Sequence, residues 1–227
     1  MRQATMTKPG HIEFGTAPEP VAGPGEILLR IKKIGVCGSD IHVWHGQHPY
    51  TPYPVIQGHE FSAVVEAVGP GVTKVKPGMK ATAAPQQVCG KCNPCKRGDY
   101  NICDTLKVRG FQAPGCAQDL FIAPEERIVA FPDHLTFEQG ALIEPAAVAA
   151  HATNRVPTLK GKNVLVTGAG TIGNLVAQAA KCRGANKVLI ADLSEFRLQK
   201  ALDAGIDGVC NVRNEKLAEK CKAFFGD

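Results

Sequence analysis

Four cysteines lie within fifteen residues of the segment QQVCGKCNPCKRGDYNICDT, at Cys89, Cys92, Cys95 and Cys103. Two nested C-x-x-C steps let pairs of sulfurs reach one ion from a single turn, and the fourth thiol completes a tetrahedral set suited to Zn(II). Because four protein ligands leave no open coordination position, the spacing predicts a structural zinc in a lobe at residues 86–105. A redox-active pair or a fortuitous group of cysteines is the alternative.

A second group of potential ligands is spread over GVCGSDIHVWHG and VIQGHEF. Cys37, His59 and Glu60 supply a thiolate, an imidazole and a carboxylate, all of which bind zinc. Three ligands are too few for a closed cage and favour an open site, where water or substrate completes the coordination of a catalytic zinc. Taken singly, residues such as Cys37 and His59 are more often core residues than metal ligands. Asp40 either caps a helix or orients a ligand.

One further carboxylate stands out, because Glu144 precedes Pro145 in a stretch of small apolar residues. Its structural alternative is a helix-start carboxylate beside the positive end of the helix dipole. His45 and His48 are expected to be loop residues.

A third motif, NVLVTGAGTIGNL, places Gly168, Gly170 and Gly173 in G-x-G-x-x-G spacing between a predicted strand and a predicted helix. Such glycines allow a tight turn, close approach of a pyrophosphate and close packing of helix and strand. Asp192 lies nineteen residues beyond Gly173, close to the distance expected for a ribose-binding carboxylate. That carboxylate would repel a 2′-phosphate and so favours NAD over NADP. Arg197, a nearby cation, complicates this preference, and its alternative roles are a solvated helix residue or a partner for Asp192. The remaining residues of the turn are Thr171 and Ile172.

The elements that must position these residues change character near residue 155. Before it, Gly, Pro and β-branched residues predict an antiparallel, barrel-like β region with the zinc lobe inserted. Strands are expected within 26–38 and 60–69, a short strand within 69–81, and two strands within 117–132 that Pro124 separates. Thr136 and Gln139 form a capping box at the start of a helical segment, 134–155, and Pro145 fits the first turn of its second helix.

From Lys162 onward, strands and helices alternate, which predicts a parallel sheet with right-handed crossovers. The helix expected from 194 has Ser194 as its N-cap and Gly205 beyond its end, and Asn214 is expected to cap the last helix. The expected strands are 163–168, 187–192 and 208–212, and the expected helices are 171–185, 194–205 and 214–225.

Composition excludes several classes of protein. The 227 residues are 44% hydrophobic and 21% charged, with a net charge of +5 that no basic block concentrates. Nucleic acid is therefore not an expected partner, nor is a membrane. The start of the chain lacks the apolar segment of a signal peptide, and nine cysteines is an odd number, so we expect a cytoplasmic protein without disulfides.

Together, GVCGSD, GHEF, the four-cysteine lobe, LIEPAAV and GAGTIG…AD resemble the zinc-dependent medium-chain alcohol dehydrogenase family. Within it, CGSDIHVWHG, EPAAV and ADLSEFRL are most similar to the sorbitol and polyol dehydrogenase branch, with threonine dehydrogenases the nearest competitors. The likeness covers essentially the whole chain. It implies an α/β protein with a GroES-like β-barrel catalytic domain, residues 1–155, and the first half of an NAD-binding Rossmann domain, residues 156–227.

The resemblance also implies roles for individual residues. Cys37 and His59 match ligands of the catalytic zinc, and Glu60 matches a carboxylate that binds or approaches it. Glu144 matches the glutamate of the polyol branch, which can act through water. Ser39 and His42 match the proton relay, and the four cysteines of the lobe match the structural zinc ligands.

The implied activity is hydride transfer between NAD and a secondary alcohol, polyol or sugar-like, whose hydroxyl is deprotonated at the zinc. An enzyme similar to L-threonine dehydrogenase, or a non-catalytic zinc- and nucleotide-binding fragment, are the alternatives. Family members continue beyond residue 227, so the second Rossmann half is missing and little turnover is expected from this chain alone. The full-length protein is expected to be a homo-oligomer.

Overall fold

The computed structural model describes residues 1–226, which divide into two compact units, one spanning Met1–Glu144 and one beginning at Pro145. This division falls inside the helical segment that precedes residue 155. The domain boundary at 155 stays a prediction.

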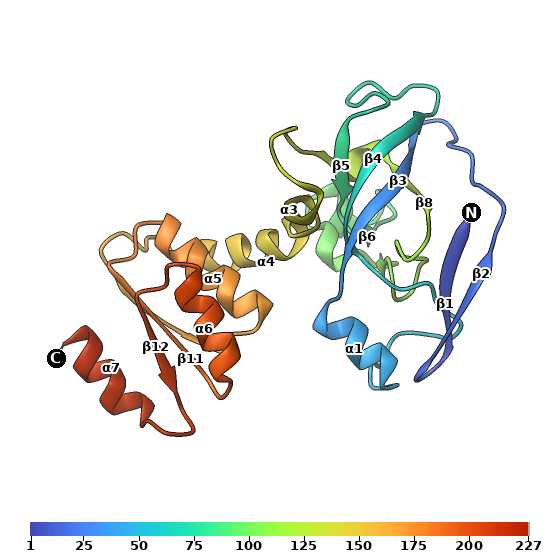
Figure 1. The fold of residues 1–227 in the computed structure, drawn as a ribbon. Helices are drawn as coiled ribbons and strands as arrows, with labels where there is room; N and C mark the ends of the chain where they lie inside the picture. Colours follow the sequence, from blue (N-terminus) through green and yellow to red (C-terminus); the bar gives the residue numbers. More distant parts are fainter. Residues whose placement is uncertain (227) are drawn as a thin grey trace. The chain divides into compact units, whose positions relative to one another are not determined.

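The first unit is built on a five-stranded antiparallel sheet with the order β8-β3-β4-β5-β9 (Figure 1). Its strands are β3 (Glu26–Gly35), β4 (Glu60–Val68), β5 (Lys80–Ala83), β8 (Leu120–Pro124) and β9 (Ile128–Ala130). Alternate residues of β3 and β4 point inward, and Ile27, Leu29, Phe61 and Val65 are almost fully buried with Phe121. This core fixes the end of β3 and the start of β4, where the predicted zinc ligands lie.

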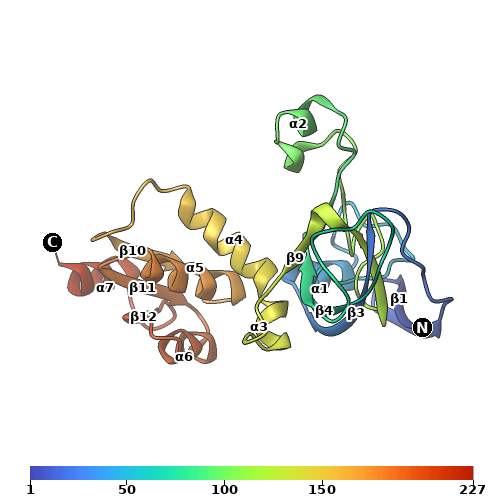
Figure 2. The ribbon, with the colours of Figure 1, turned by 90° about the horizontal axis from the view of Figure 1, so that it is seen from above.

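Two smaller two-stranded sheets flank this core. A hairpin joins β1 (Arg2–Lys8) to β2 (His11–Thr16), and β6 (Gln86–Gln87) pairs with β7 (Lys107–Val108). Between β6 and β7 lies the cysteine lobe, with α2 (Asn93–Lys96) and a 3₁₀ turn, η1 (Tyr100–Ile102). Figure 2 shows the lobe that carries α2 standing clear of the strands of this unit.

The short strand predicted within 69–81 is wrong, because this segment runs as turns up to β5. The reason is a side chain from a distant part of the chain. Glu125, in the 3₁₀ turn η2 (Glu125–Arg127), accepts backbone N–H bonds from Thr73 and Lys74 at 2.6 and 2.5 Å. These N–H groups are thus satisfied by a carboxylate rather than by a neighbouring strand.

The second unit contains the predicted parallel sheet, with the order β10-β11-β12. Its strands are β10 (Asn163–Thr167), β11 (Lys187–Asp192) and β12 (Gly208–Asn211), and its helices are α5 (Thr171–Cys182), α6 (Glu195–Asp203) and α7 (Leu217–Phe225). Val188 and Ile190 of β11 pack in the cluster that includes α5 and α6, whereas Leu189 and Ala191 face α7. The central strand is therefore buried on both faces, as in α/β sheets with helices on each side.

The helix caps test the local predictions. Thr136 forms the predicted capping box with Gln139 at α3 (Phe137–Ala141), and Ser194 caps α6. Asn214 as the cap of the last helix is wrong, because α7 begins only after Lys216. The N–H of Asn214 donates to the carbonyl of Asn211 at 3.0 Å, in a turn that delays the helix.

The remaining helices are α1 (Gly38–Trp44), which follows β3, and α4 (Ile143–Asn154), which spans the division between the units. Within residues 1–226, every helix is too short or too polar to cross a lipid bilayer.

Candidate active site and metal centres

The open cluster predicted from the sequence is assembled in the first unit. One ligand atom from each of Cys37, His59 and Glu60 lies within 4.8 Å of the other two. Cys37 is the residue before α1, and His59 and Glu60 stand at the start of β4. Because β3 and β4 are neighbours, with Gly35 opposite Glu60, the antiparallel pairing brings residues 37 and 59 together across 22 residues of sequence.

Gly35 leaves the space that the Glu60 carboxylate occupies. A methyl group added to Gly35 would lie 2.5 Å from Glu60 Oε2 and 2.9 Å from its Cβ. Glu60 is buried, at 6% exposure, so its carboxylate has little room to move elsewhere.

Asp40 lies close to both Cys37 and His59. The sequence left open whether it caps a helix or orients a ligand. Its carboxylate accepts the backbone N–H of Cys37 at 2.9 Å, as part of a capping box for α1. Its Oδ1 also lies 3.9 Å from Nδ1 of His59. Gln57 donates from Nε2 to the Asp40 carbonyl at 3.2 Å, tying α1 to the strand entry. Asp40 therefore caps the helix and faces a ligand at the same time.

The buried Nδ1 of His59 has no hydrogen-bond partner among the described residues. A buried ring nitrogen without a partner is costly in a metal-free protein. Histidines that bind metal commonly direct their second nitrogen at a carboxylate, and Asp40 lies in that direction.

The electrostatics of the cluster favour a cation. Burial lowers the pKa of His59, but Cys37, Asp40 and Glu144 outweigh it and raise that pKa overall. Burial raises the pKa of Glu60 and also that of Glu144. A thiol and several buried carboxyl groups around one imidazole form the kind of site that a divalent cation stabilises.

The predicted relay residues lie on α1, next to this cluster in the chain. Ser39 and His42 are three residues apart on the helix, so their side chains leave from the same side. Ser39 is half-buried and His42 is exposed. Exposure thus increases from Ser39 to His42 along the helix.

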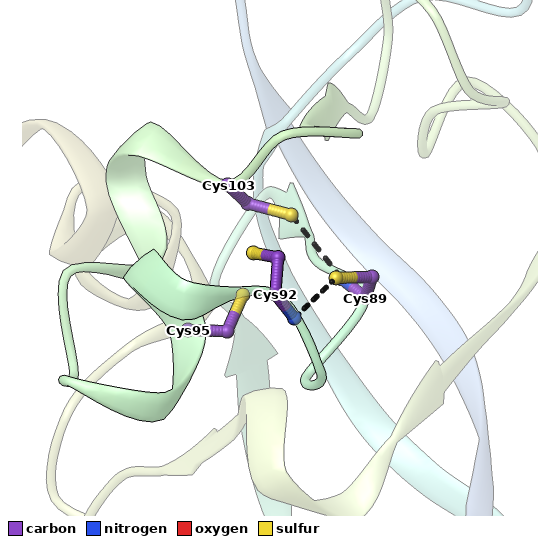
Figure 3. A group of neighbouring side chains, drawn as sticks. All are labelled: Cys89, Cys92, Cys95 and Cys103. Carbon is purple, nitrogen blue, oxygen red and sulfur yellow. Dashed lines mark hydrogen bonds between the residues drawn. The ribbon is translucent and has the colours of Figure 1, made fainter.

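The four cysteines of the lobe also converge, with their sulfurs within 4.8 Å of one another. Figure 3 shows the four thiols directed at a common centre. The N–H of Cys92 points to Sγ of Cys89 at 3.3 Å, and the N–H of Cys89 points to Sγ of Cys103 at 3.4 Å. Backbone N–H groups of Lys91 and Cys92 lower the pKa of Cys89 to about 6, which favours the thiolate that zinc requires.

Both clusters therefore fit Zn(II), in different ways. The lobe offers four sulfurs and no further protein ligand is needed, as in structural sites. The other cluster offers a sulfur, a nitrogen and an oxygen, which leaves room for an exogenous ligand.

The glycine-rich turn lies between β10 and α5 in the second unit, with α5 beginning at Thr171 and including Ile172. Gly168 has φ of +91°, a conformation that glycine adopts without strain. A methyl group on Gly173 would lie 1.8 Å from the carbonyl oxygen of Gly168, whereas one on Gly170 would meet nothing within 4 Å. Gly173 thus allows the first turn of α5 to pack closely against Gly168, and Gly170 leaves space open above the helix N-terminus.

Asp192 is bound into this turn. Its Oδ2 accepts the N–H of Ala169 at 2.7 Å and its Oδ1 accepts the N–H of Ser194 at 2.8 Å. Burial raises the pKa of Asp192, but these N–H groups outweigh burial and keep that pKa below its usual value. Arg197 Nη1 lies 3.9 Å from Oδ2 on a largely exposed side chain. Arg197 and Asp192 are thus close enough to form an ion pair.

Sequence reasoning missed an aromatic contact to the open cluster. The ring of Phe111 lies 5.0 Å from that of His59, and the ring of His48 stacks on Phe111 at 4.7 Å. Thr51 Oγ1 is 2.7 Å from Nδ1 of His48. His48 lies in a loop, as expected, and its ring packs against the neighbour of a candidate ligand. Nothing in the local sequence around Phe111 signals this contact, which joins segments some fifty residues apart.

Comparison with known proteins gives consistent matches. Residues 23–133 match the family model of the alcohol dehydrogenase GroES-like domain, and residues 171–227 match that of zinc-binding dehydrogenases. An L-threonine 3-dehydrogenase from Rhizobium johnstonii is 37% identical over 210 residues, which are 91% of this chain and 61% of that protein. The chain thus spans about 61% of the length of this curated relative.

Solved structures agree. Galactitol-1-phosphate dehydrogenase from Escherichia coli superposes with a TM-score of 0.90 at 29% identity, over 99% of this chain and 65% of that one. An alcohol dehydrogenase from Escherichia coli CFT073, solved with NADH, gives 0.90 at 32% identity, over 98% and 66%. The GroES-like first unit and the Rossmann-like second unit expected from the sequence are confirmed as folds by these matches.

Proposed function

The chain belongs to the zinc-dependent medium-chain alcohol dehydrogenase family, and from this premise we propose that the protein transfers hydride between NAD and a secondary alcohol of the polyol or sugar-like class. The observation that carries the proposal is the convergence of Cys37, His59 and Glu60 on an incomplete ligand set. Glu144, which acts on the same imidazole, adds a further carboxyl group.

Cys37, His59 and Glu60 would hold the catalytic metal, with Glu144 joining directly or through water. When bound, zinc supplies Lewis acidity that lowers the pKa of a coordinated hydroxyl. Ser39 would accept the proton that the substrate hydroxyl loses, and His42, exposed on the same side of α1, would pass it to solvent. Asp40 would keep the imidazole of His59 oriented. Cys89, Cys92, Cys95 and Cys103 would hold the structural zinc of the lobe.

The second unit would bind the adenosine and pyrophosphate parts of the dinucleotide. Gly168, Gly170 and Gly173, with Thr171 and Ile172, would present the N-terminus of α5 to the pyrophosphate. Asp192 supports NAD rather than NADP, because its ionised carboxylate would repel a 2′-phosphate near the ribose. Arg197, already 3.9 Å from Asp192, would be partly neutralised by it.

The experiment compares NAD-linked oxidation of a panel of polyols and sugar alcohols with oxidation of L-threonine, using the full-length protein. Turnover of polyols with NAD, two zinc ions per chain and weak use of NADP are the expected results. The Cys37→Ser and His59→Ala variants should each lose one zinc and all turnover, whereas Cys182→Ser, at an exposed free cysteine of α5, should retain both. A wild-type protein with only the lobe zinc and no turnover would instead identify a non-catalytic binding module.

L-threonine is the second candidate substrate, because the curated relative at 37% identity is an L-threonine 3-dehydrogenase. Faster oxidation of L-threonine than of any polyol in the same panel would select this reading.

A small-molecule alcohol is the partner that this family membership implies. We also propose a cytoplasmic location, since all nine cysteines are unpaired and suit a reducing compartment. Assembly of the full-length protein as a homo-oligomer is part of the same proposal, and light scattering would test it.

A further inference from the structure

We propose that residues 110–117, here named the crossing loop, are the positioning device for the metal ligand His59, with Gly115 as its critical residue. This inference rests on the proposed function, because it concerns the open metal site. It assigns a role to a segment that supplies no ligand and no predicted catalytic group.

The crossing loop lies directly against the backbone that leads into His59. Three of its N–H groups donate to consecutive carbonyls of that backbone. These bonds run from Gly115 to Ile56, from Ala117 to Gln57 and from Cys116 to Gly58, with N···O distances of 2.7, 2.9 and 2.9 Å. The three residues before His59 are therefore held by one segment from more than fifty residues away.

Glycines allow this close approach. A methyl group on Gly115 would lie 2.3 Å from the carbonyl oxygen of Gly58 and 2.4 Å from that of Gln57. One on Gly110 would lie 2.9 Å from the nitrogen of Gly58. Both obstacles are backbone atoms, which cannot swing aside as a flexible side chain can. The two segments would have to separate.

Gly58 is itself restricted on the opposite side of the crossing. Its φ is +94°, and a methyl group there would lie 2.8 Å from Sγ of Cys116, which is fully buried. The turn that aims residue 59 at the cluster is thus set by a glycine conformation and fixed by the loop packed on it.

The crossing loop also touches the ligand itself. The Phe111 ring lies 5.0 Å from the His59 ring at an interplanar angle of 47°. Phe111 is buried, at 6% exposure. Backbone hydrogen bonds thus fix the position of the His59 backbone, and the Phe111 ring limits the rotation of the His59 imidazole. Groups that orient metal ligands commonly change metal affinity about 10- to 100-fold when removed.

The test is the zinc affinity of the open site in a Gly115→Ala variant of the full-length protein, measured by competition with a chromophoric chelator in the absence of NAD and substrate. We expect two classes of zinc in the wild type, and the Cys37→Ser variant, which retains only the lobe zinc, identifies each class. Gly115→Ala should weaken the open site about 10- to 100-fold and leave the lobe site unchanged. Gly15→Ala is the matched control, since a methyl there meets nothing within 4 Å.

Each result decides the matter. A folded Gly115→Ala protein with wild-type affinity at both sites would overturn the inference while leaving the proposed function intact. A wild type that binds only the lobe zinc would overturn the proposed function and this inference with it. If Gly115→Ala does not fold, Phe111→Leu decides, because it keeps the backbone crossing. Weaker zinc binding at the open site alone then supports the inference, and unchanged binding overturns it.

Discussion

Alanine substitutions at two glycines of the glycine-rich turn should differ in effect. Gly173→Ala should lower stability, whereas Gly170→Ala should leave stability intact and abolish nucleotide binding. In Gly173→Ala the new methyl would start 1.8 Å from the Gly168 carbonyl oxygen, so the turn and α5 must move apart by about 1.6 Å to reach an ordinary contact. In Gly170→Ala the methyl meets nothing, and the backbone of Gly170, at φ of −67°, suits alanine. One variant tests packing within the turn, and the other tests only the space above it.

The magnitudes follow from these contacts. Overpacking costs roughly 1–3 kcal/mol, and about 1 kcal/mol shifts Tm by ~2–4 °C in a chain of this size, so Gly173→Ala should melt about 2–12 °C below the wild type. Gly170→Ala should melt within a few degrees of the wild type, or slightly above it, because alanine reduces the entropy of the unfolded chain. Its binding of NADH or ADP-ribose should nevertheless be lost, because the methyl would occupy the place of the pyrophosphate.

Thermal denaturation by circular dichroism and titration calorimetry with ADP-ribose measure the two effects separately. Equal melting temperatures for Gly173→Ala and the wild type would refute the packing argument. Undiminished ADP-ribose binding by Gly170→Ala would refute the assignment of that space to a pyrophosphate.

Three further predictions concern other parts of the chain. Cys103→Ser should lower the zinc content by one ion per chain and make the lobe sensitive to protease, with the Cys37 site still loaded; unchanged zinc by mass spectrometry would contradict this. Gly35→Ala should displace the buried Glu60 carboxylate and weaken zinc binding at the open site, and a crystal structure of the variant with Glu60 unmoved would count against the argument. For Asp207, burial raises the pKa but Lys181 and a backbone N–H of β11 outweigh it, so the native pKa lies below 3.8. Its contribution to stability, about 1–2 kcal/mol, should therefore be present above pH 3.8 and fade as pH falls through the lowered pKa. Urea titrations should give free energies of unfolding for Asp207→Asn and the wild type that converge at low pH. A difference between them that stays constant with pH would contradict the prediction.

The sequence predicted best what depends on neighbours in the chain. The four thiols of the lobe lie within fifteen residues, so their convergence needed only a local loop. Caps such as Thr136 and Ser194 were predictable for the same reason, because each bonds to a residue three positions ahead.

The sequence-based predictions of local structure were wrong where a side chain accepted backbone N–H groups and so favoured a turn. The strand expected within 69–81 is replaced by turns because Glu125 binds two of its N–H groups. Asn214 does not cap α7 because a turn after Asn211 intervenes, in which the Glu215 side chain accepts the N–H of Asn211 at 3.1 Å. Secondary-structure propensity alone predicts neither of these hydrogen bonds from a side chain to the backbone.

The open cluster falls between these cases. Chemistry suggested that Cys37, His59 and Glu60 could share an ion, but only the family resemblance indicated that they would meet. Their meeting depends on the β3–β4 register, and the position of His59 depends further on Phe111 and the crossing loop. These are contacts between segments that no local pattern links.

Asp192 has a structural role in addition to the ribose-binding role that its motif predicts. Spacing identified it as a ribose-binding carboxylate, yet both of its oxygens already accept N–H groups, from Ala169 in the glycine-rich turn and from Ser194 at the start of α6. An amide could accept at only one of these positions and would present its own N–H₂ group to the other donor. The charge that we propose favours NAD over NADP and the bonds that join β10, β11 and α6 therefore reside in the same carboxylate. A substitution of Asp192 that is designed to change the proposed cofactor preference should therefore also loosen the glycine-rich turn.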